Sequence, residues 1–538
     1  MSIKYGVLAL FLARLAFCQP SEISASRIRA HVKFLASDLL EGRGVGTRGG
    51  DLATEYIAAQ LALAGAIPAG DGGSYFQRVP LVGVITHPDA ELSAVKGEER
   101  ATFHWVADFV ASSHRQRTRE TIDAEAVFVG HGITAPDYKW NDYKSVDVRG
   151  KVVVLFTNEP QPDNPDVFKG RALTYYGRWT YKYEEALRHG AAGCIIIHTT
   201  PTAGYGWDVV RNSWSKEDAQ VKVEPGNAAL ALAGWVTQDA GEKLLELSGH
   251  TIPELLKAAD SREFRPIRLG IRIRATLNAD IRQIESRNVA AIVRGSDPTA
   301  KDEYVIFSAH WDHLGIALPV NGDAIYNGAI DNATGCGILL ETARAWGALQ
   351  EKPRRSALFL AYTAEEAGLR GAEYYARHPI VPLSKTALDI NYDALFPYGR
   401  TKDIIVEGAD RTTLWPVVLQ DAKRLEYTIK ASPRPEQGGY YRSDQLMLAR
   451  EGIPGFRIQS GSDIYGKSAA YAAEVFTEYN TMHYHQPSDE FHEDWGFSGL
   501  EYAAKFGMMI GLDTAEMTKM PAWTNDDEFP TVRSGATK

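Results

Sequence analysis

Strand-like and helix-like segments alternate along the second half of the chain, and this alternation constrains the fold more than any other feature. Apolar runs typical of buried strands occupy residues 288–295, 303–310, 357–363 and 386–393. Helical patterns occupy residues 337–349, 371–377 and 414–425. Such alternation predicts an α/β fold. We expect a mixed, mostly parallel sheet with helices on both faces.

The first half of the chain has a different pattern. Residues 26–39 and 55–63 have helical spacing, and the stretch EGRGVGTRGG lies between them. This stretch formally matches the dinucleotide-binding pattern G-x-G-x-x-G, but it follows a helix rather than a strand, which favours a structural turn. From about residue 117, short strands with a single helix at residues 181–189 are predicted.

The 538 residues are too many for one core of ordinary size, so more than one domain is expected. The changes of pattern predict a signal peptide at 1–18, an N-terminal part of the α/β domain at 19–116, an inserted mainly-β domain at 117–280, the main α/β domain at 281–524 and a polar tail at 525–538.

The first residues have the features of a secretory signal. An early lysine precedes an apolar run over residues 7–17, and a small residue at Cys18 suits cleavage before Gln19. Although Arg14 interrupts the run, we expect export to the periplasm or the extracellular space. A lipid anchor on Cys18 is the alternative, but Phe17 is a poor residue for that motif.

Composition argues against several classes of protein. The net charge is −10, and no block of Lys and Arg could follow a phosphate backbone, so nucleic acid is not an expected partner. No further stretch reaches the roughly 18 apolar residues of a membrane span. Cys194 and Cys336 fall in different predicted domains, so neither a disulfide framework nor a cysteine zinc site is indicated.

Five side chains that bind divalent metals follow successive predicted strands or lie in the loops after them: His310, Asp331, Glu366, Asp393 and His485. A metal site needs nitrogen and oxygen donors that converge on one point, and the loops after parallel strands bring side chains together in this way. Any one of these residues alone would more often be a cap or a hydrogen-bonded structural group. The ordered set of five favours a metal site.

The motifs around these residues carry a family resemblance. In chain order, HWD, DNATG, AEEAGLRGAEYYA, NYD and YHQPSDE resemble the bacterial co-catalytic zinc aminopeptidases of metallopeptidase clan MH. The resemblance covers residues 26–63 and 286–495. Within the predicted insertion, VFVGHGI, DVRGKVVV and KYEEALRHGAAGCIII resemble the protease-associated domain, which several exported peptidases carry. This domain is expected to border the cleft and to restrict substrate size.

The resemblance implies two zinc ions as cofactors. By this resemblance, His310 and Asp393 bind one ion, Glu366 and His485 bind the other, and Asp331 bridges both. Two dications close together repel each other strongly, which agrees with a shared carboxylate.

The resemblance also implies catalytic roles for three further residues. Glu365 would be the general base that moves a proton from a metal-bound water to the leaving amine. Asp312 would accept a hydrogen bond from the His310 imidazole and fix its tautomer. Tyr484 would donate to the oxyanion of the tetrahedral intermediate.

The same motifs argue against three nearby residues as metal ligands. The H-x-D pattern does not require His313, and His485 rather than His483 is followed by QPSDE. The N-x-D form of NYD favours Asp393 over Asp389.

The chain departs from the family pattern in two places. The family usually has His where this chain has Gln445, so Asp444 beside it is a candidate only for an indirect role. The 21-residue step from His310 to Asp331 is longer than in the shortest members. Added loop length costs little, and this loop is expected to line the cleft.

The expected function is that of an exported aminopeptidase with peptides as substrates. One alternative is a carboxypeptidase or dipeptidase resembling glutamate carboxypeptidase, for which Arg178, Arg434 and Arg442 could bind a terminal carboxylate. A single-zinc glutaminyl cyclase is disfavoured because all five ligands are present. An inactive receptor-like relative is disfavoured because Glu365 is present as well.

Overall fold

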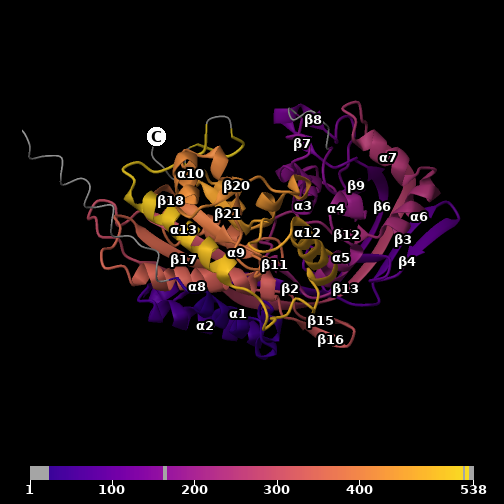
Figure 1. Ribbon diagram of the computed structural model, residues 1–538. Helices are drawn as coiled ribbons and strands as arrows, with labels where there is room; N and C mark the ends of the chain where they lie inside the picture. Colours follow the sequence, from indigo (N-terminus) through magenta and orange to yellow (C-terminus); the bar gives the residue numbers. More distant parts are fainter. Residues whose placement is uncertain (1–22, 161–166, 525–526, 532, 534–538) are drawn as a thin grey trace, which may run out of the picture.

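The computed structural model describes residues 23–160, 167–524, 527–531 and 533. These residues form two large β-sheets, each with its own helices, joined by one long strand (Figure 1), together with two small two-stranded sheets. The expected signal peptide at 1–18 lies outside the described residues. Within the described part, we find no helix with the length and apolar character needed to cross a bilayer.

The first sheet is mixed and has a parallel centre. In order of pairing its strands are β11 (Asp218–Val221), β2 (Phe76–Thr86), β13 (Ile267–Val293), β17 (Ser356–Tyr362), β14 (Tyr304–His310), β18 (Thr386–Tyr392), β21 (Gly455–Ser460), β19 (Asp403–Glu407) and β20 (Thr428–Lys430). The short β1 (Ile67–Pro68) also pairs with β13. Strands β17, β14, β18 and β21 run parallel to one another. The predicted α/β fold is confirmed.

Helices cover both faces of this sheet. The core on one face includes residues of α1 (Ala25–Leu35), α2 (Arg48–Leu63), α8 (Thr334–Gly347) and α13 (Ser498–Glu516). The core on the other face includes residues of α9 (Arg370–Arg377) and α11 (Gln445–Ala449). Side chains alternate along a strand, so Val305 and Phe307 of β14 face the first core while Tyr304 and Ile306 face the second. Helix α10 (Trp415–Arg424) packs beside α13.

The second sheet is built around the first half of β13. In order of pairing its strands are β4 (Glu99–Phe103), β3 (Glu91–Lys96), β13, β6 (Arg119–Phe128), β9 (Val152–Phe156), β10 (Gly193–Ile197), β12 (Leu232–Val236) and β5 (Phe109–Ser112). Strands β3, β4 and β5 precede residue 117, so this sheet includes residues from before the expected boundary. The boundaries of an inserted domain, and its likeness to a protease-associated domain, stay predictions.

The expectation of a single helix in residues 117–280 is wrong. Besides α3 (Trp179–Arg188), this region contains α4 (Thr200–Ala203), α5 (Trp207–Trp214), α6 (Gln238–Ser248) and α7 (Ile252–Ala259). Leu244 and Leu255 are buried in the second sheet's core, and Thr237 and Thr251 cap the N-termini of α6 and α7. Such short helices offer only two or three turns of periodic pattern, which makes them hard to recognise in sequence.

Strand β13 joins the two sheets. Residues 267–278 pair with β6, whereas residues 279–289 pair with β2 and residues 289–293 with β17. One unbroken backbone therefore fixes the orientation of one sheet relative to the other.

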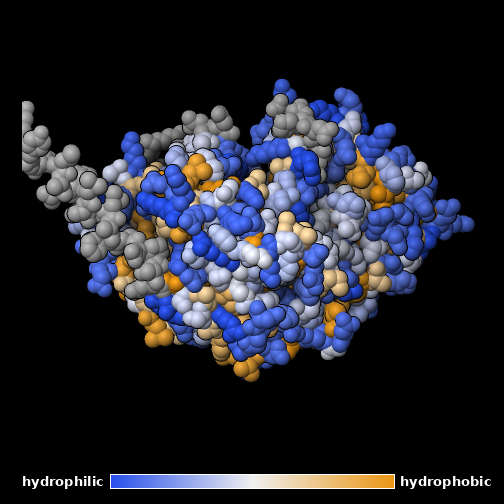
Figure 2. Space-filling view, viewed as in Figure 1, coloured by the Kyte–Doolittle hydropathy of each residue, from blue (hydrophilic) through white to orange (hydrophobic). Residues whose placement is uncertain are grey.

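Two segments differ from expectation in where they pack. The long step between His310 and Asp331 forms a hairpin of β15 (Gly315–Val320) and β16 (Asp323–Tyr326), which contacts the turn η2 (Asp38–Arg43). Part of the expected tail also packs, because Phe529 is buried in a cluster with Trp523 and Glu528 forms an ion pair with Arg411 at 2.6 Å. The face seen in Figure 2 is mainly hydrophilic, with its hydrophobic residues scattered.

Candidate metal centre

The five predicted donors converge at the carboxyl ends of the central parallel strands. His310 ends β14, while Glu366 and Asp393 follow β17 and β18. Asp331 lies in the turn η6 (Ala329–Ala333) before α8, and His485 follows the turn η11 (Tyr479–His483). Their side chains are only 1% to 9% exposed, so water screens their charges weakly.

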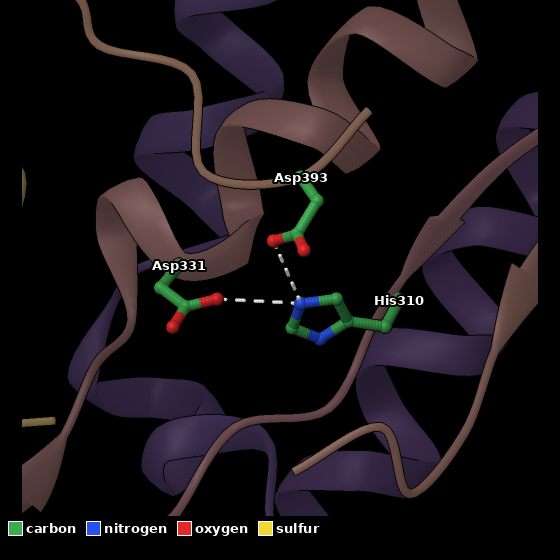
Figure 3. Close-up of side chains that lie close together, drawn as sticks. All are labelled: His310, Asp331 and Asp393. Carbon is green, nitrogen blue, oxygen red and sulfur yellow. Dashed lines mark hydrogen bonds and ion pairs between the residues drawn. The ribbon is translucent and has the colours of Figure 1, made fainter. Parts of the chain in front are cut away.

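Three of the donors form one half of the centre. The His310 Nε2 atom lies 3.3 Å from Asp331 Oδ1 and 3.4 Å from Asp393 Oδ1 (Figure 3). All three side chains point into the same space from three different segments. Their donor atoms lie within 4.8 Å of one another, which is close enough to bind one metal ion.

The other half lies across Asp331. His485 Nε2 is 3.0 Å from Glu366 Oε2 and 3.4 Å from Asp331 Oδ2. The two oxygens of Asp331 therefore face opposite halves of the centre, one toward His310 and one toward His485. A carboxylate in this position can bridge two cations.

The space between the donors carries an excess of negative charge, which attracts cations. Four carboxylates, those of Asp331, Glu365, Glu366 and Asp393, surround the two imidazoles. Burial lowers the pKa of His485, but Glu366 and Asp331 outweigh that effect and raise the pKa to about 9. Imidazoles that hold protons this strongly lie in a site that attracts positive charge. The donor set of two nitrogens and several carboxylate oxygens fits divalent metal ions.

Asp312 is placed differently from the expectation. The Nδ1 atom of His310 lies 3.1 Å from the backbone oxygen of Asp312, whereas the nearest carboxylate oxygen is 4.0 Å away. The Asp312 carboxylate instead accepts hydrogen bonds from the backbone N–H groups of Glu365, at 3.1 Å, and Glu366, at 3.4 Å. Asp312 thus orients His310 through its main chain and the Glu365–Glu366 turn through its side chain.

Glu365 and Tyr484 lie beside the donors. The nearest Glu365 oxygen is 4.0 Å from His310 Nε2. Burial, with the carboxylates of Asp393 and Glu366, raises the pKa of Glu365 well above its usual range. Burial likewise raises the pKa of Tyr484, so its phenol remains protonated at neutral pH.

The structure brings His313 into the centre although the sequence motif set it aside. Its Nδ1 atom lies 2.5 Å from Glu366 Oε1, and the ring is fully buried. The position three residues after His310 was the only signal for it. The other residues set aside lie elsewhere, since His483 contacts Ser488 at 2.9 Å and Asp389 accepts a hydrogen bond from Ser308 at 2.7 Å.

Two further residues form hydrogen bonds to the segments that carry the donors. Asp489, the Asp of the QPSDE motif, accepts hydrogen bonds from the backbone N–H groups of Ile330 and Asp331 at 2.9 and 3.1 Å. Gln445 accepts a hydrogen bond from Asn391 at 2.9 Å, two residues before Asp393. Both residues support donor segments rather than the donors' side chains.

A cavity of about 470 Å³ opens onto the centre. Asp331, Glu365 and Asp393 form its acidic end, together with Tyr484. The apolar lining is an aromatic and aliphatic wall of Phe396, Ile405 and Phe476, and the basic lining is Arg434, Arg442 and Arg457. Arg457 Nη2 lies 3.7 Å from Asp393 Oδ2 at the acidic end. The β15–β16 hairpin does not line this cavity, and Gly315 and Ile316 border a smaller one on the other side of Glu366.

Comparisons with known proteins find relatives among peptidases. Residues 288–499 match the sequence profile of Peptidase family M28. Aminopeptidase NAALADL1 of Mus musculus is 28% identical over 170 residues, which are 29% of this chain and 21% of that protein. Glutamate carboxypeptidase 2 homolog of Caenorhabditis elegans is 24% identical over 410 residues, which are 67% of this chain and 48% of that protein. The chain thus matches half or less of the length of these relatives.

A solved structure shows the same fold over most of the chain. The aminopeptidase from Aneurinibacillus sp. strain AM-1 superposes with a TM-score of 0.52 at 18% sequence identity. The superposition covers 91% of this chain and 94% of that structure.

Proposed function

We propose that this chain, whose residues 288–499 belong to Peptidase family M28, is an exported metallo-aminopeptidase with two zinc ions that removes N-terminal residues from peptides. The observation that carries the proposal is the position of Asp331, whose two carboxylate oxygens face His310 and His485 from between them. In this proposal His310 and Asp393 hold one ion, Glu366 and His485 hold the other, and Asp331 binds both.

The residues around the centre supply the proton transfers. When bound, two zinc ions polarise the scissile carbonyl and lower the pKa of a water molecule at the site. Glu365 takes a proton from the attacking water as the water oxygen bonds to the carbonyl carbon, and it delivers that proton to the amine nitrogen as the peptide C–N bond breaks. Tyr484 donates its O–H to the negative oxygen that develops on the substrate.

The cavity suits the free amino end of a peptide. The carboxylates at its acidic end attract an α-ammonium group, and the wall of Phe396, Ile405 and Phe476 accepts an apolar first side chain. The test compares Leu-Gly-Gly with N-acetyl-Leu-Gly-Gly. We expect acetylation to lower kcat/KM by about 100-fold or more, because a charged group is lost from an acidic pocket. Equal turnover of the two peptides would contradict the aminopeptidase assignment.

The number of metal ions is tested separately. Metal analysis of the purified protein should give two zinc ions per chain, and a chelator should remove activity that added zinc restores. A single ion per chain at full activity would contradict the bridging role of Asp331.

Two arginines favour a second candidate function, that of a carboxypeptidase or dipeptidase. Arg178 and Arg442 line a smaller cavity together with Glu365, Tyr484 and His485. Burial and the like charge of Arg442 lower the pKa of Arg178 to about 10. Among the described residues neither guanidinium forms an ion pair, although Arg442 donates to the backbone oxygen of Ala203 at 3.3 Å. Both guanidinium groups could bind a substrate carboxylate.

A comparison of a free dipeptide with its amide separates the two candidate functions. A carboxypeptidase or dipeptidase would cleave Leu-Leu but not Leu-Leu-amide, and Arg178→Met and Arg442→Met would raise KM for Leu-Leu. An aminopeptidase would cleave both, because it recognises only the amino end.

Export is the remaining part of the proposal. N-terminal sequencing of the protein from the periplasm or the medium should find Gln19 as the first residue. Accumulation of chains that still begin with Met1 in the cytoplasm would contradict it.

A further inference from the structure

Helix α5, which packs on the second sheet, reaches the candidate metal centre of the first. Ser213 Oγ lies 2.9 Å from His485 Nδ1, and Asn212 Nδ2 donates to the backbone oxygen of His485 at 3.0 Å. Just beyond the helix, Lys216 Nζ donates to the backbone oxygen of Leu314 at 3.2 Å. One short segment of the second sheet's part of the molecule thus contacts two loops of the centre.

We propose that Asn212 and Ser213 are positioning residues that hold His485 in its metal-binding geometry. The second sheet's part of the molecule is then a component of the metal centre and not only a cover over it. This inference rests on the proposed metallopeptidase function, because His485 is assigned as a metal ligand there.

Ser213 fixes the imidazole ring. The Nε2 atom of His485 faces Glu366 at 3.0 Å and Asp331 at 3.4 Å, so it is the nitrogen available to a metal ion. A neutral imidazole that binds metal through Nε2 carries its proton on Nδ1. In that tautomer the Ser213 hydroxyl oxygen accepts a hydrogen bond from Nδ1–H, which resists rotation of the ring.

Asn212 fixes the backbone. His485 has a φ of 57°, in the left-handed region that costs a residue other than glycine about 1 kcal/mol. The Asn212 side chain is fully buried and donates to the carbonyl of this strained residue. Arg211 Nε donates to Asn212 Oδ1 at 3.1 Å, so the amide presents its NH₂ group to His485.

Helix α5 is anchored well enough to serve as a support. The ring of Trp214 packs against Trp179 and Tyr183 with centroid separations of 5.6 and 5.7 Å, and Val210 is buried in the same core. Since these contacts hold the helix from the second sheet, Ser213 cannot follow His485 if the ring moves. This is the arrangement that a positioning role requires.

The test measures zinc affinity by chelator competition on the full-length protein. Ser213→Ala should weaken zinc binding by about 10- to 100-fold. Ser213→Thr keeps the hydroxyl and should retain most of the affinity. Ser215→Ala is the matched control, because it makes the same change two residues along the chain, at a buried hydroxyl with no partner in the described structure. Asn212→Asp keeps the shape of the side chain but replaces the donor, and should weaken binding as Ser213→Ala does.

Two further measurements separate positioning from loss of folding. The melting temperature of the metal-free protein should be the same for Ser213→Ala and Ser215→Ala, and the visible absorption of the Co²⁺-loaded protein should change only for Ser213→Ala. In a His485→Ala background, Ser213→Ala should have no further effect on zinc affinity, because its partner is gone.

Equal zinc affinity of Ser213→Ala, Ser215→Ala and the unaltered chain would overturn the inference. Such a result with intact peptide hydrolysis leaves the proposed function standing. The opposite result, a Ser213-dependent zinc affinity without hydrolysis of any peptide, overturns the proposed function and leaves the positioning role standing.

Discussion

Glu365 and Glu366 are adjacent in sequence but have different surroundings. Burial raises the pKa of both carboxyl groups. For Glu366 the nearby His485 and His313 reverse this effect and lower the pKa well below its usual range, whereas that of Glu365 stays well above it. Two neighbouring carboxylates with opposite shifts suit the separate tasks of ligand and base.

The division of tasks predicts the effect of Glu365→Gln. We expect kcat to fall by about 10³-fold, because the amide cannot accept a proton. Zinc affinity should stay within a few-fold of the unaltered chain, since Glu365 is not assigned as a ligand. The checks are steady-state kinetics and zinc competition on the same preparation. Retained hydrolysis would show that another group is the base, and lost zinc would show that Glu365 is a ligand.

His31 on α1 gives a prediction about pH. Burial, with Arg27 and Arg344 opposing Glu341, lowers the pKa of His31 to about 4. The folded state therefore does not bind the proton that the His31 side chain takes up in the unfolded chain below a pKa of about 6.5. Stability from this group is complete above pH 6.5 and is lost as pH falls toward 4.

His31→Gln should remove this dependence. Between pH 7.5 and pH 5 the unaltered chain should lose about 2 kcal/mol more stability than the variant, by linkage of protonation to folding. Urea unfolding at the two pH values measures the difference, and His104→Gln at an exposed position is the control. An identical pH slope for the unaltered chain and His31→Gln would refute the assignment.

The residues found from sequence share one property. His310, Asp331, Glu366, Asp393 and His485 each lie in a local motif directly after a strand or turn, so sequence order alone placed them at one sheet edge. Asn212 and Ser213 were not foreseen, because only packing brings them to the centre. Arg178 was named only as a candidate to bind a substrate carboxylate, and His313 was set aside by the H-x-D motif. Asn212, Ser213 and Arg178 come from the second sheet's part of the molecule, and no local pattern records contacts between distant segments.

At the scale of elements, the turn η2, in which the glycine-rich stretch begins, stabilises the loops of the centre. Arg43 is 1% exposed, and its guanidinium donates to the backbone oxygens of Leu35, Trp311, Asn327 and Gly328 at 2.6 to 2.9 Å. Trp311 adjoins His310, and Gly328 lies just before the η6 turn that holds Asp331. The turn predicted from EGRGVGTRGG is thus structural, but its link to the metal loops depends on a side chain whose partners the sequence does not specify.

Arg43→Met should loosen these loops. Four buried carbonyls would lose their donor, which we expect to cost about 3 kcal/mol or more and to weaken zinc binding as well. Arg48→Met is the control, because Arg48 is exposed and its ion pair with Glu41 should contribute less than about 1 kcal/mol. Thermal melting with and without zinc measures both effects. Similar melting temperatures for the two variants would contradict the structural role of Arg43.

At the scale of the whole molecule, strand β13 and helix α5 make one unit of the two sheets. The α/β pattern after Asn288 predicted β14, β17, β18 and the end of β13, because each of these is a continuous apolar run. It did not predict β2, β11, β19, β20 and β21 of the first sheet. The 27-residue β13 was not predicted, since residues 267–278 alternate polar and apolar residues and the later part is more uniformly apolar. The uniformly apolar run at residues 289–293 lies where β13 pairs with β17, whereas residues 279–288, which pair with β2 in the first sheet, are still mostly polar.

The joined sheets place Tyr205, between α4 and α5, at the edge of the main cavity. Tyr205 lines that cavity, and the Arg442 guanidinium lies 5.3 Å from the centre of its ring. A ring held in this way by the second sheet's part of the molecule limits the room for a long peptide.

Tyr205→Ala should therefore raise kcat/KM for peptides of eight or more residues relative to dipeptides by about 3- to 10-fold, a change of roughly 1 kcal/mol in relative binding. Competition between a dipeptide and a nonapeptide in one reaction measures the ratio, and Tyr205→Phe, which keeps the ring, should leave it unchanged. If Tyr205→Ala alters both substrates equally, the second sheet does not select peptide length at this edge.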